Sequence, residues 1–255
     1  MKRSPRPVPW LKAGEEFPTL SSAWGADEAA PGLLAAGGAL DVNSLLRAYG
    51  AGIFPWFSLG QPILWWTPDP RMVLLTSDFK LHRSLKKTLQ RFVKTPTCAV
   101  TFDSNFDQVI SACANAPRDG QSGTWIVPDM IAAYRDLHHA GHAHSVETWV
   151  NGELVGGLYC VNLGGMVFGE SMFAHQTDAS KIALSALVAF CKAKNISMID
   201  CQQNTQHLSS FGAREITREA FAAHLNEQTG RANPEWIFEA QHWNEILPTH
   251  TEPRL

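Results

Sequence analysis

The sequence lacks the cysteine pattern that a disulfide framework or a thiolate zinc site requires. Its cysteines are odd in number and include no C-x-x-C pair; the five stand at positions 98, 113, 160, 191 and 201. Free thiols fit a reducing compartment, so we expect a cytoplasmic protein. Several histidines lie close together, but Gly141 is expected to end their helix, which places His138 and His144 on opposite sides of a turn. We therefore predict no metal.

Long apolar runs are also missing. The longest, Ile182–Cys191, is about ten residues, whereas a membrane-spanning helix needs ~20. The basic start of the chain runs into Pro5, Pro7 and Pro9 where a signal peptide would have an apolar core. We expect neither a targeting segment nor contact with a membrane.

Three catalytic or nucleotide-binding signatures are absent. The chain has no G-x-x-x-x-G-K-[ST] loop and no G-x-S-x-G elbow, and Gly156-Gly157 is not part of a G-x-G-x-x-G fingerprint. These absences argue against nucleotide hydrolysis, dinucleotide redox chemistry and an α/β-hydrolase. The net charge of −3 excludes a global basic field, so any surface for nucleic acid must be local.

What is present supports one sizeable core with a smaller lobe. The 255 residues are 45% hydrophobic. Residues 1–70 are rich in Pro, Gly and Trp and contain one predicted helix, Val42–Tyr49, with Asp41 as its cap. Thr67-Pro68-Asp69-Pro70 interrupts regular structure. We predict a small N-terminal lobe, 1–70, and a main domain, 71–255.

The main domain is predicted to alternate helices and strands. Asn151-Gly152 and Gly164-Gly165 mark the turns of a three-stranded meander. The pattern indicates a mixed α/β (α+β) layer with a mixed sheet. Predicted strands are 72–75, 98–102, 144–150, 153–162, 166–173 and 197–201, and predicted helices are 79–93, 105–114, 129–140 and 178–193.

The predicted helix 79–93 carries charge of one sign. No acidic residue lies between Asp78 and Asp103. On a helix the basic side chains share one face, opposite an apolar one, which favours a phosphate-backbone partner. An ordinary basic surface helix is the alternative. The candidate phosphate-binding residues on this face are Lys80, Arg83, Lys87, Arg91 and Lys94.

Aromatic residues are concentrated in the predicted lobe, in Gly52–Phe57 and Trp65-Trp66. Aromatic rings in loops can stack on an exposed nucleobase. Trp56 is one candidate for this role, and Trp125, farther along the chain, is another. The alternative is that these rings seal a small core poor in regular structure.

Two polar residues near the end of the last predicted strand form the strongest candidate site. If Ile199–Gln202 is a strand, Asp200 and Gln202 point to one face. A carboxylate beside an amide can hold and polarise an attacking amine, and Glu170 supplies a second carboxylate. Asp200 could instead cap the turn before the next helix.

Together these segments resemble the leucyl/phenylalanyl-tRNA–protein transferase family. Motifs in family order and spacing cover about residues 30–221. Departures at Cys160, Val167, Ala174 and Phe211 are mild. The resembling stretches are Tyr49–Trp56, Trp65–Arg71, Gly123–Ile126, Gly141–Glu147, Leu154–Tyr159, Gly169–Phe173, Ala179–Lys181 and Ile199–Gln202.

The resemblance implies a small lobe followed by an N-acyltransferase domain of the acetyltransferase (GNAT) type. It also implies transfer of Leu or Phe from aminoacyl-tRNA to the N-terminal Arg or Lys of an acceptor protein, which marks that protein for degradation. Met is a further candidate donor residue. An acetyl-CoA enzyme would carry an [RQ]-x-x-G-x-[GA] loop, which His175–Ser180 lacks, so no cofactor is expected.

The resemblance also implies roles for individual residues. Asp200 would hold or deprotonate the attacking amine, directly or through Gln202, and Gln202 would orient the amine and the ester. Glu170 would recognise the cationic N-terminus through charge-assisted hydrogen bonds. Residues implied to bind the donor are Leu158, Leu184 and Ile199 around the aminoacyl side chain, with Trp56 and Trp125 at the terminal adenosine.

Two alternative functions remain open at this point. One is a CoA-dependent N-acyltransferase, which the missing loop disfavours. The other is a non-catalytic RNA-binding module that uses the basic helix and the aromatic loops. A chain of this length can form one self-sufficient enzyme, so we expect a monomer.

Overall fold

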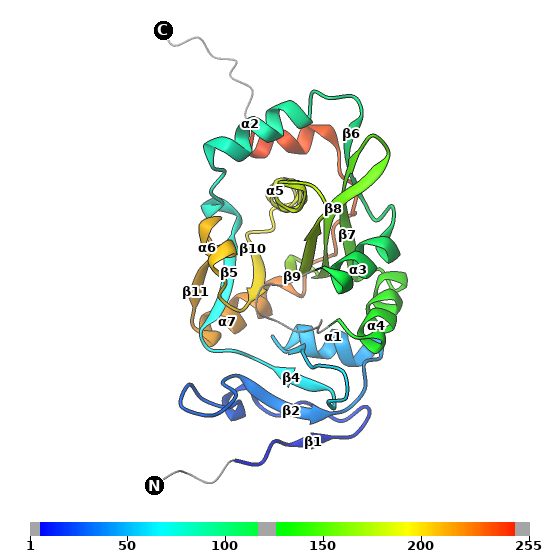
Figure 1. Ribbon diagram of the computed structural model, residues 1–255. Helices are drawn as coiled ribbons and strands as arrows, with labels where there is room; N and C mark the ends of the chain where they lie inside the picture. The colour runs from blue at the N-terminus through cyan, green and yellow to red at the C-terminus, as the bar shows by residue number, and fades with distance from the viewer. Residues whose placement is uncertain (1–5, 117–125, 248–255) are drawn as a thin grey trace.

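The computed structural model describes residues 6–116 and 126–247, and it has a mixed α/β architecture built on two sheets (Figure 1). The smaller sheet lies near the N-terminus and the larger one above it in the view of Figure 1. One cluster of buried apolar side chains includes Leu34 and Tyr49 from the N-terminal part together with Val73 and Phe168 from the larger sheet. The two sheets therefore share a core.

The N-terminal sheet has four short strands in the order β1-β2-β4-β3. Helix α1 (Val42–Gly50) follows β2 and confirms the predicted helix; its cap is Asp41, which accepts a hydrogen bond from the Ser44 N–H at 3.0 Å. Sequence analysis did not identify these strands, because they are too short to show alternation. Their bounds are β1 Trp10–Leu11, β2 Leu33–Gly37, β3 Phe54–Pro55 and β4 Leu64–Trp66.

The larger sheet has seven strands in the order β11-β5-β10-β9-β8-β7-β6. Strands β9 and β10 pair in parallel and the remaining pairs are antiparallel, so the predicted mixed sheet and its meander are confirmed. The bounds are β5 Arg71–Leu75, β6 Cys98–Phe102, β7 Ala143–Val150, β8 Glu153–Leu163, β9 Met166–Ala174, β10 Met198–Gln202 and β11 Arg214–Ile216.

Helices cover both faces of this sheet. Helix α5 lies across one face and is buried along most of its length, while α3 and α4 lie on the other face with α1 (Figure 1). The approach of α5 is close: a Cβ atom added to Gly156 of β8 would lie 2.5 Å from the Ala179 Cβ. The bounds are α2 Arg83–Phe92, α3 Phe106–Asn115, α4 Pro128–His139, α5 Ala179–Ala193, α6 Gln206–Ser210 and α7 Arg218–Gln228, with 3-10 turns at Leu20–Ser22, Thr76–Asp78 and Ala240–Glu245.

Helix α2 is shorter than the predicted helix 79–93. It begins at Arg83 because the preceding residues bond to the segment after α6 instead of continuing the helix. The Lys80 N–H donates to the Phe211 carbonyl at 2.9 Å, and a ring nitrogen of His82 lies 2.7 Å from the Ser210 carbonyl oxygen. Lys80 therefore precedes α2, which corrects its predicted place within the helix, and Lys94 follows α2 as it followed the predicted helix.

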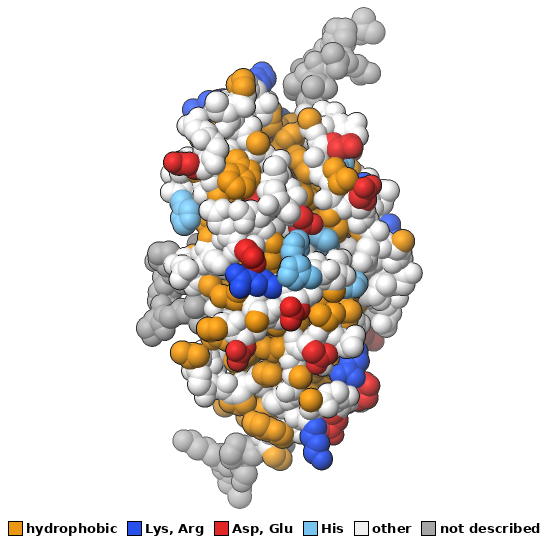
Figure 2. Space-filling model, turned by 90° about the vertical axis from the view of Figure 1, so that its right-hand side faces the viewer, with side chains coloured by type: hydrophobic (Ala, Val, Ile, Leu, Met, Phe, Trp, Pro, Cys, Tyr) orange, Lys and Arg blue, Asp and Glu red, His pale blue; other side chains and the backbone are white. Residues whose placement is uncertain are grey.

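Charge is spread over much of the surface. On the face shown in Figure 2, Lys and Arg side chains are scattered and alternate with acidic and histidine side chains, so that face has no continuous basic area.

Within residues 6–116 and 126–247, no helix combines the length and apolarity needed to cross a membrane.

A buried ion pair joins two neighbouring strands of the larger sheet. The Arg71 guanidinium of β5 donates two hydrogen bonds to the Asp200 carboxylate of β10, from Nε to Oδ1 at 2.8 Å and from Nη2 to Oδ2 at 2.7 Å. The two side chains are 1% and 0% exposed. Arg71 Nη1 also donates to the Gly52 carbonyl at 3.1 Å, and its guanidinium lies between the rings of Phe54 and Phe221. Arg71 therefore ties β5 and β10 to the small lobe and to α7.

Replacing Arg71 should destabilise the fold strongly. Arg71→Met leaves the Asp200 carboxylate buried without its counter-charge, so we expect the free energy of unfolding to fall by about 3–5 kcal/mol. Urea denaturation followed by circular dichroism measures this. The control is Arg135→Met, because Arg135 pairs with Asp107 on the surface, at 42% and 67% exposure, and should lose less than about 1 kcal/mol. Equal losses for the two variants would contradict the prediction.

Candidate active site

A cavity of 340 Å³ opens where β9 and β10 part. These two strands pair only at Ile199 with Val167 and at Asp200 with Phe168. Beyond that point β9 continues alongside β8, and β10 ends in a bulge. The residues that follow on each strand, from Gly169 on β9 and from Cys201 on β10, line the opening.

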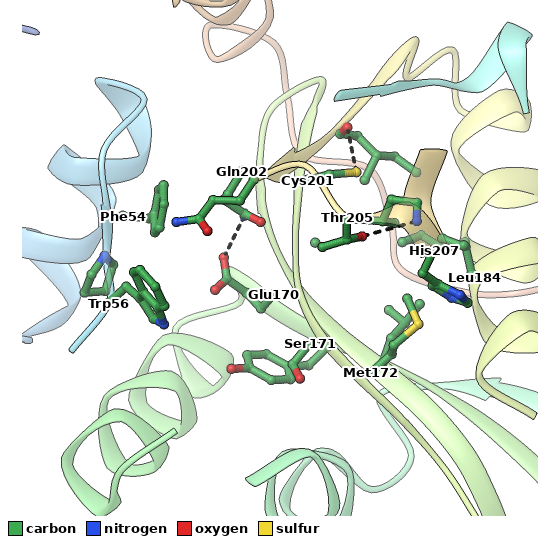
Figure 3. A pocket seen from close by; sticks show the side chains of 18 residues that line it. Phe54, Trp56, Glu170, Ser171, Met172, Leu184, Cys201, Gln202, Thr205 and His207 are labelled. Atoms are coloured by element: carbon green, nitrogen blue, oxygen red, sulfur yellow. Dashed lines mark hydrogen bonds between the residues drawn. The ribbon is translucent and has the colours of Figure 1, made fainter. Parts of the chain in front are cut away.

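The cavity has an aromatic end, a polar middle and an apolar end (Figure 3). Phe54 and Trp56 of the small lobe lie at one end, and the Trp56 carbonyl accepts a hydrogen bond from the Trp66 ring N–H at 2.7 Å. Glu170 and Gln202 lie in the middle. At the other end, Figure 3 shows Met172 of β9 and Leu184 beside Thr205 and His207. The apolar lining of the cavity also includes Leu158, Leu187, Ile199 and Leu208.

Most residues expected to bind the aminoacyl-adenosine therefore share this cavity. Trp56, Leu158, Leu184 and Ile199 line it together, although they come from the small lobe, β8, α5 and β10. Trp125 lies outside the described residues. The lining also includes residues that sequence analysis did not single out, among them Thr205, His207 and Leu208 at or near the start of α6.

Glu170 is held by two buried tyrosines. The Tyr49 hydroxyl lies 2.7 Å from Oε1 and the Tyr134 hydroxyl 3.1 Å from Oε2, and the two hydroxyl oxygens are also within hydrogen-bond distance of each other. When both hydroxyls donate to ionised Glu170, neither has a proton left to donate to the other. The Gln202 side-chain amide lies 3.5 Å from Oε1, at the limit of a hydrogen bond. The dashed line in Figure 3 joins these two residues. Glu170 thus contacts α1, α4 and β10 at once.

Sequence analysis missed Tyr49 and Tyr134, although the composition held a signal. The chain has only three tyrosines against thirteen phenylalanines, so a hydroxyl on an aromatic ring is rare here. The third, Tyr159, lines the cavity, and its ring packs edge-on against Tyr134 at 5.4 Å between centroids. All three lie around Glu170.

Burial of the Glu170 carboxyl group shifts its pKa toward neutral pH. Desolvation raises the pKa of Glu170 to about 7; the two tyrosine hydrogen bonds oppose the shift and the Asp200 charge adds to it. Burial, with the charge of Glu170, raises the pKa values of Tyr49 and Tyr134 well above their ordinary value. The tyrosines therefore remain neutral donors near pH 7, while Glu170 exchanges its proton there.

Asp200 lies behind the cavity wall and is absent from its lining. Both of its oxygens bind Arg71, and Oδ1 also accepts the Gln202 backbone N–H at 3.1 Å. The bulge between Asp200 and Gln202, with Gln202 at φ 56°, interrupts the simple alternation assumed from the sequence. Asp200 does not cap the next helix, since Thr205 accepts the Leu208 N–H there at 3.2 Å. The contact of Asp200 with the site runs through Gln202.

The candidate tRNA-binding side chains are all exposed. Arg83, Lys87 and Arg91 project from α2, with Lys80 before the helix and Lys94 after it. Among the described residues, no acidic side chain forms a salt bridge with any of them. This surface is therefore positive and uncompensated, unlike the face in Figure 2.

Two histidines near Gly141 approach the same carboxylate: ring nitrogens of His144 and His138 lie 2.7 Å and 3.9 Å from the two oxygens of Asp103. The His138 nitrogen also lies 2.8 Å from the Ala143 carbonyl oxygen. In the part of the chain that the structure describes, no three His, Cys, Asp or Glu side chains gather in a group able to hold a metal ion.

Comparison with known protein families gives two matches in chain order. Residues 38–69 match the leucyl/phenylalanyl-tRNA protein transferase N-terminal domain. Residues 73–226 match the leucyl/phenylalanyl-tRNA protein transferase model. The two matches adjoin between β4 and β5 and include every described residue that lines the cavity.

Curated relatives match over nearly their whole length. A protein of Polaromonas sp. (strain JS666) is 66% identical over 255 residues, all of both chains. One from Albidiferax ferrireducens is 58% identical over 247 residues, 97% of each chain, and one from Methylibium petroleiphilum is 55% identical over 247 residues, 96% of this chain and 93% of that one. Each is named leucyl/phenylalanyl-tRNA–protein transferase.

Similarity to solved structures is weaker. A conserved protein of unknown function from Bacteroides thetaiotaomicron aligns over 56% of this chain and 53% of its own, at 16% identity and a TM-score of 0.41. This similarity is too low to assign the fold, so the expected GNAT type is not established by it. The family matches and the curated relatives, in contrast, are extensive, and the chain belongs to the leucyl/phenylalanyl-tRNA protein transferase family.

Proposed function

We propose that this protein transfers Leu or Phe from aminoacyl-tRNA to the α-amine of an N-terminal Arg or Lys, and so marks acceptor proteins for degradation. The observation that carries the proposal is a single cavity in which an apolar end adjoins the Glu170–Gln202 pair, in a chain of this family. It acts as a monomer in the cytoplasm and without a bound cofactor, and Met-tRNA is a further candidate donor.

The apolar end selects the donor. Leu158, Leu184 and Ile199 line space that suits an apolar side chain such as that of Leu or Phe. Burial of a Leu or Phe side chain is worth about 1.5–3 kcal/mol, which an ester of a polar amino acid cannot gain. The adenosine of the donor lies toward Trp56, with Trp125 as a second ring.

The polar middle aligns the amine. Its nitrogen attacks the ester carbonyl, the C–N bond forms, the bond to the ribose oxygen breaks, and the amine proton ends on that oxygen. Because the ester is already activated, orientation of the two reactants is the main requirement. Ionised Glu170 attracts the ammonium form and takes one of its protons, which leaves the neutral amine that attacks, while Gln202 orients the amine and the ester. Asp200 positions Gln202 through its backbone N–H.

The proposal includes a division of the chain near residue 70 and a GNAT-type main domain. The four-stranded sheet ends with β4 at Trp66 and the seven-stranded sheet starts with β5 at Arg71, which supports the division. The order of meander, central α5 and following β10 supports the assignment of the main domain. The stretch His175–Ser180 before α5 carries no glycine with which to cradle a pyrophosphate.

Loss of the Gln202 amide should slow transfer. We expect Gln202→Ala to lower kcat by about 100-fold, since general acid–base and orienting groups contribute at least that much. The assay follows labelled Phe from Phe-tRNA to a peptide that begins with Arg, with Leu- and Met-tRNA in parallel. Gln61→Ala, at an exposed position outside the cavity lining, is the control and should stay near the wild-type rate. An unchanged transfer rate in a folded Gln202→Ala protein would contradict the role assigned to Gln202.

The contribution of Glu170 should titrate near neutral pH. The pKa of Glu170 is about 7, so at lower pH its carboxyl is protonated and neutral and no longer attracts the ammonium group. The acceptor amine itself titrates nearby, but this cancels in the ratio of kcat/KM between wild type and Glu170→Gln. We expect the ratio to lie near one at low pH and to rise at least about tenfold as pH passes 7. A ratio that does not change with pH would contradict this role.

Removing charge from α2 should weaken tRNA binding in a salt-dependent way. For Arg83→Ala with Lys87→Ala, loss of two phosphate contacts should flatten the slope of log K against log [salt] by up to about 1.8. Filter binding across a salt series measures the slope. Arg6→Ala with Lys12→Ala removes the same charge from exposed positions on the small lobe and serves as control. An equal slope for wild type and the α2 variant would reject this surface.

A further inference from the structure

The short helix α6 forms one wall at the apolar end of the cavity. His207 and Leu208 of this helix line the cavity, and Figure 3 shows His207 on the same side of it as Leu184 of α5. A helix of five residues is not stable by itself, so its position depends on the side chains that pack against it.

The ring of Phe211, the residue after α6, packs against His207. The two side chains are four residues apart and so lie on one face, and their rings meet edge to face with centroids 5.1 Å apart. Phe211 also stacks on Phe79, with ring centroids 5.9 Å apart and 11° between the planes. Phe211 is 3% exposed and does not line the cavity. It therefore reaches the cavity only through other side chains.

The backbone around Phe211 is anchored to the segment before α2. The Phe211 carbonyl accepts the Lys80 N–H at 2.9 Å. Gly212 approaches the same segment so closely that an added Cβ atom would collide with the Asp78 carbonyl oxygen. The Phe211 ring is therefore held in place from outside α6, and it limits how far His207 can move away from the cavity.

We infer that Phe211, through His207, sets the width of the apolar end and so the preference between donor amino acids. The inference rests on the proposed function, in which this end holds the Leu or Phe side chain. A smaller side chain at position 211 leaves space beside His207, and neighbouring groups relax into such space. The apolar end then widens, which favours the larger Phe donor over Leu. Phe211 is thus a positioning residue.

The test measures kcat/KM for Phe-tRNA and for Leu-tRNA with one acceptor peptide that begins with Arg. In Phe211→Leu, the ratio of Phe to Leu should rise by about three- to tenfold. This is less than the roughly 10–200-fold that a methylene group in direct contact can contribute to discrimination, because Phe211 acts through another side chain. Loss of stability alone would lower both transfer rates together and leave the ratio unchanged.

His207→Ala removes the ring through which Phe211 acts. His207 is exposed, so the variant should fold, and its ratio of Phe to Leu should also rise. Adding Phe211→Leu to His207→Ala should then change the ratio by less than about twofold, because residues that act through one contact are not additive. A second full rise in the double variant would overturn the route through His207.

Phe102→Leu is the matched control. It makes the same change in the same apolar cluster, on the edge strand β6 and outside the cavity lining, and should keep the wild-type ratio. An unchanged ratio in Phe211→Leu would overturn the inference and leave the proposed function standing. If the wild-type protein transferred neither Phe nor Leu, the proposed function would fail and the inference with it.

Discussion

The Arg71–Asp200 ion pair is the constraint on which the site depends. Two charges taken out of water are tolerated only when each meets several partners in fixed geometry. Here those partners come from β5, β10 and the Gly52 carbonyl of the small lobe, with aromatic rings on both sides of the guanidinium. The position of the small lobe against the sheet and the bulge at Gln202 are therefore fixed by the same contact.

A second polar cluster, centred on Glu170 in the cavity, spans the same junction. Glu170 extends from β9 and is held by Tyr49 of α1 and Tyr134 of α4. Neutral hydroxyls satisfy both carboxylate oxygens without cancelling the charge, which leaves the pKa of Glu170 near neutrality. A cation in the same position would instead have held that pKa low. The cluster thus combines a rigid carboxylate with the capacity to exchange a proton.

The periodic part of the fold followed from the sequence, and the irregular part did not. The meander, α3, α4 and α5 were predicted because their apolar periods are long and their turns carry glycine. Strands of two to five residues in the small lobe, and the start of α2, depend on partners far along the chain. The Lys80 N–H bonds to the Phe211 carbonyl, a contact that no local pattern encodes.

By itself the sequence determined the family, the mixed α/β class and the residue types of the site, because motif order and apolar periodicity are properties of the chain. Only the tertiary structure decided how those residues are used. It directed Asp200 away from the cavity toward Arg71 and placed Tyr49 and Tyr134 on Glu170. The reason is physical: a buried carboxylate takes whichever donors the packing brings to it, and those donors come from elements more than 30 residues away along the chain.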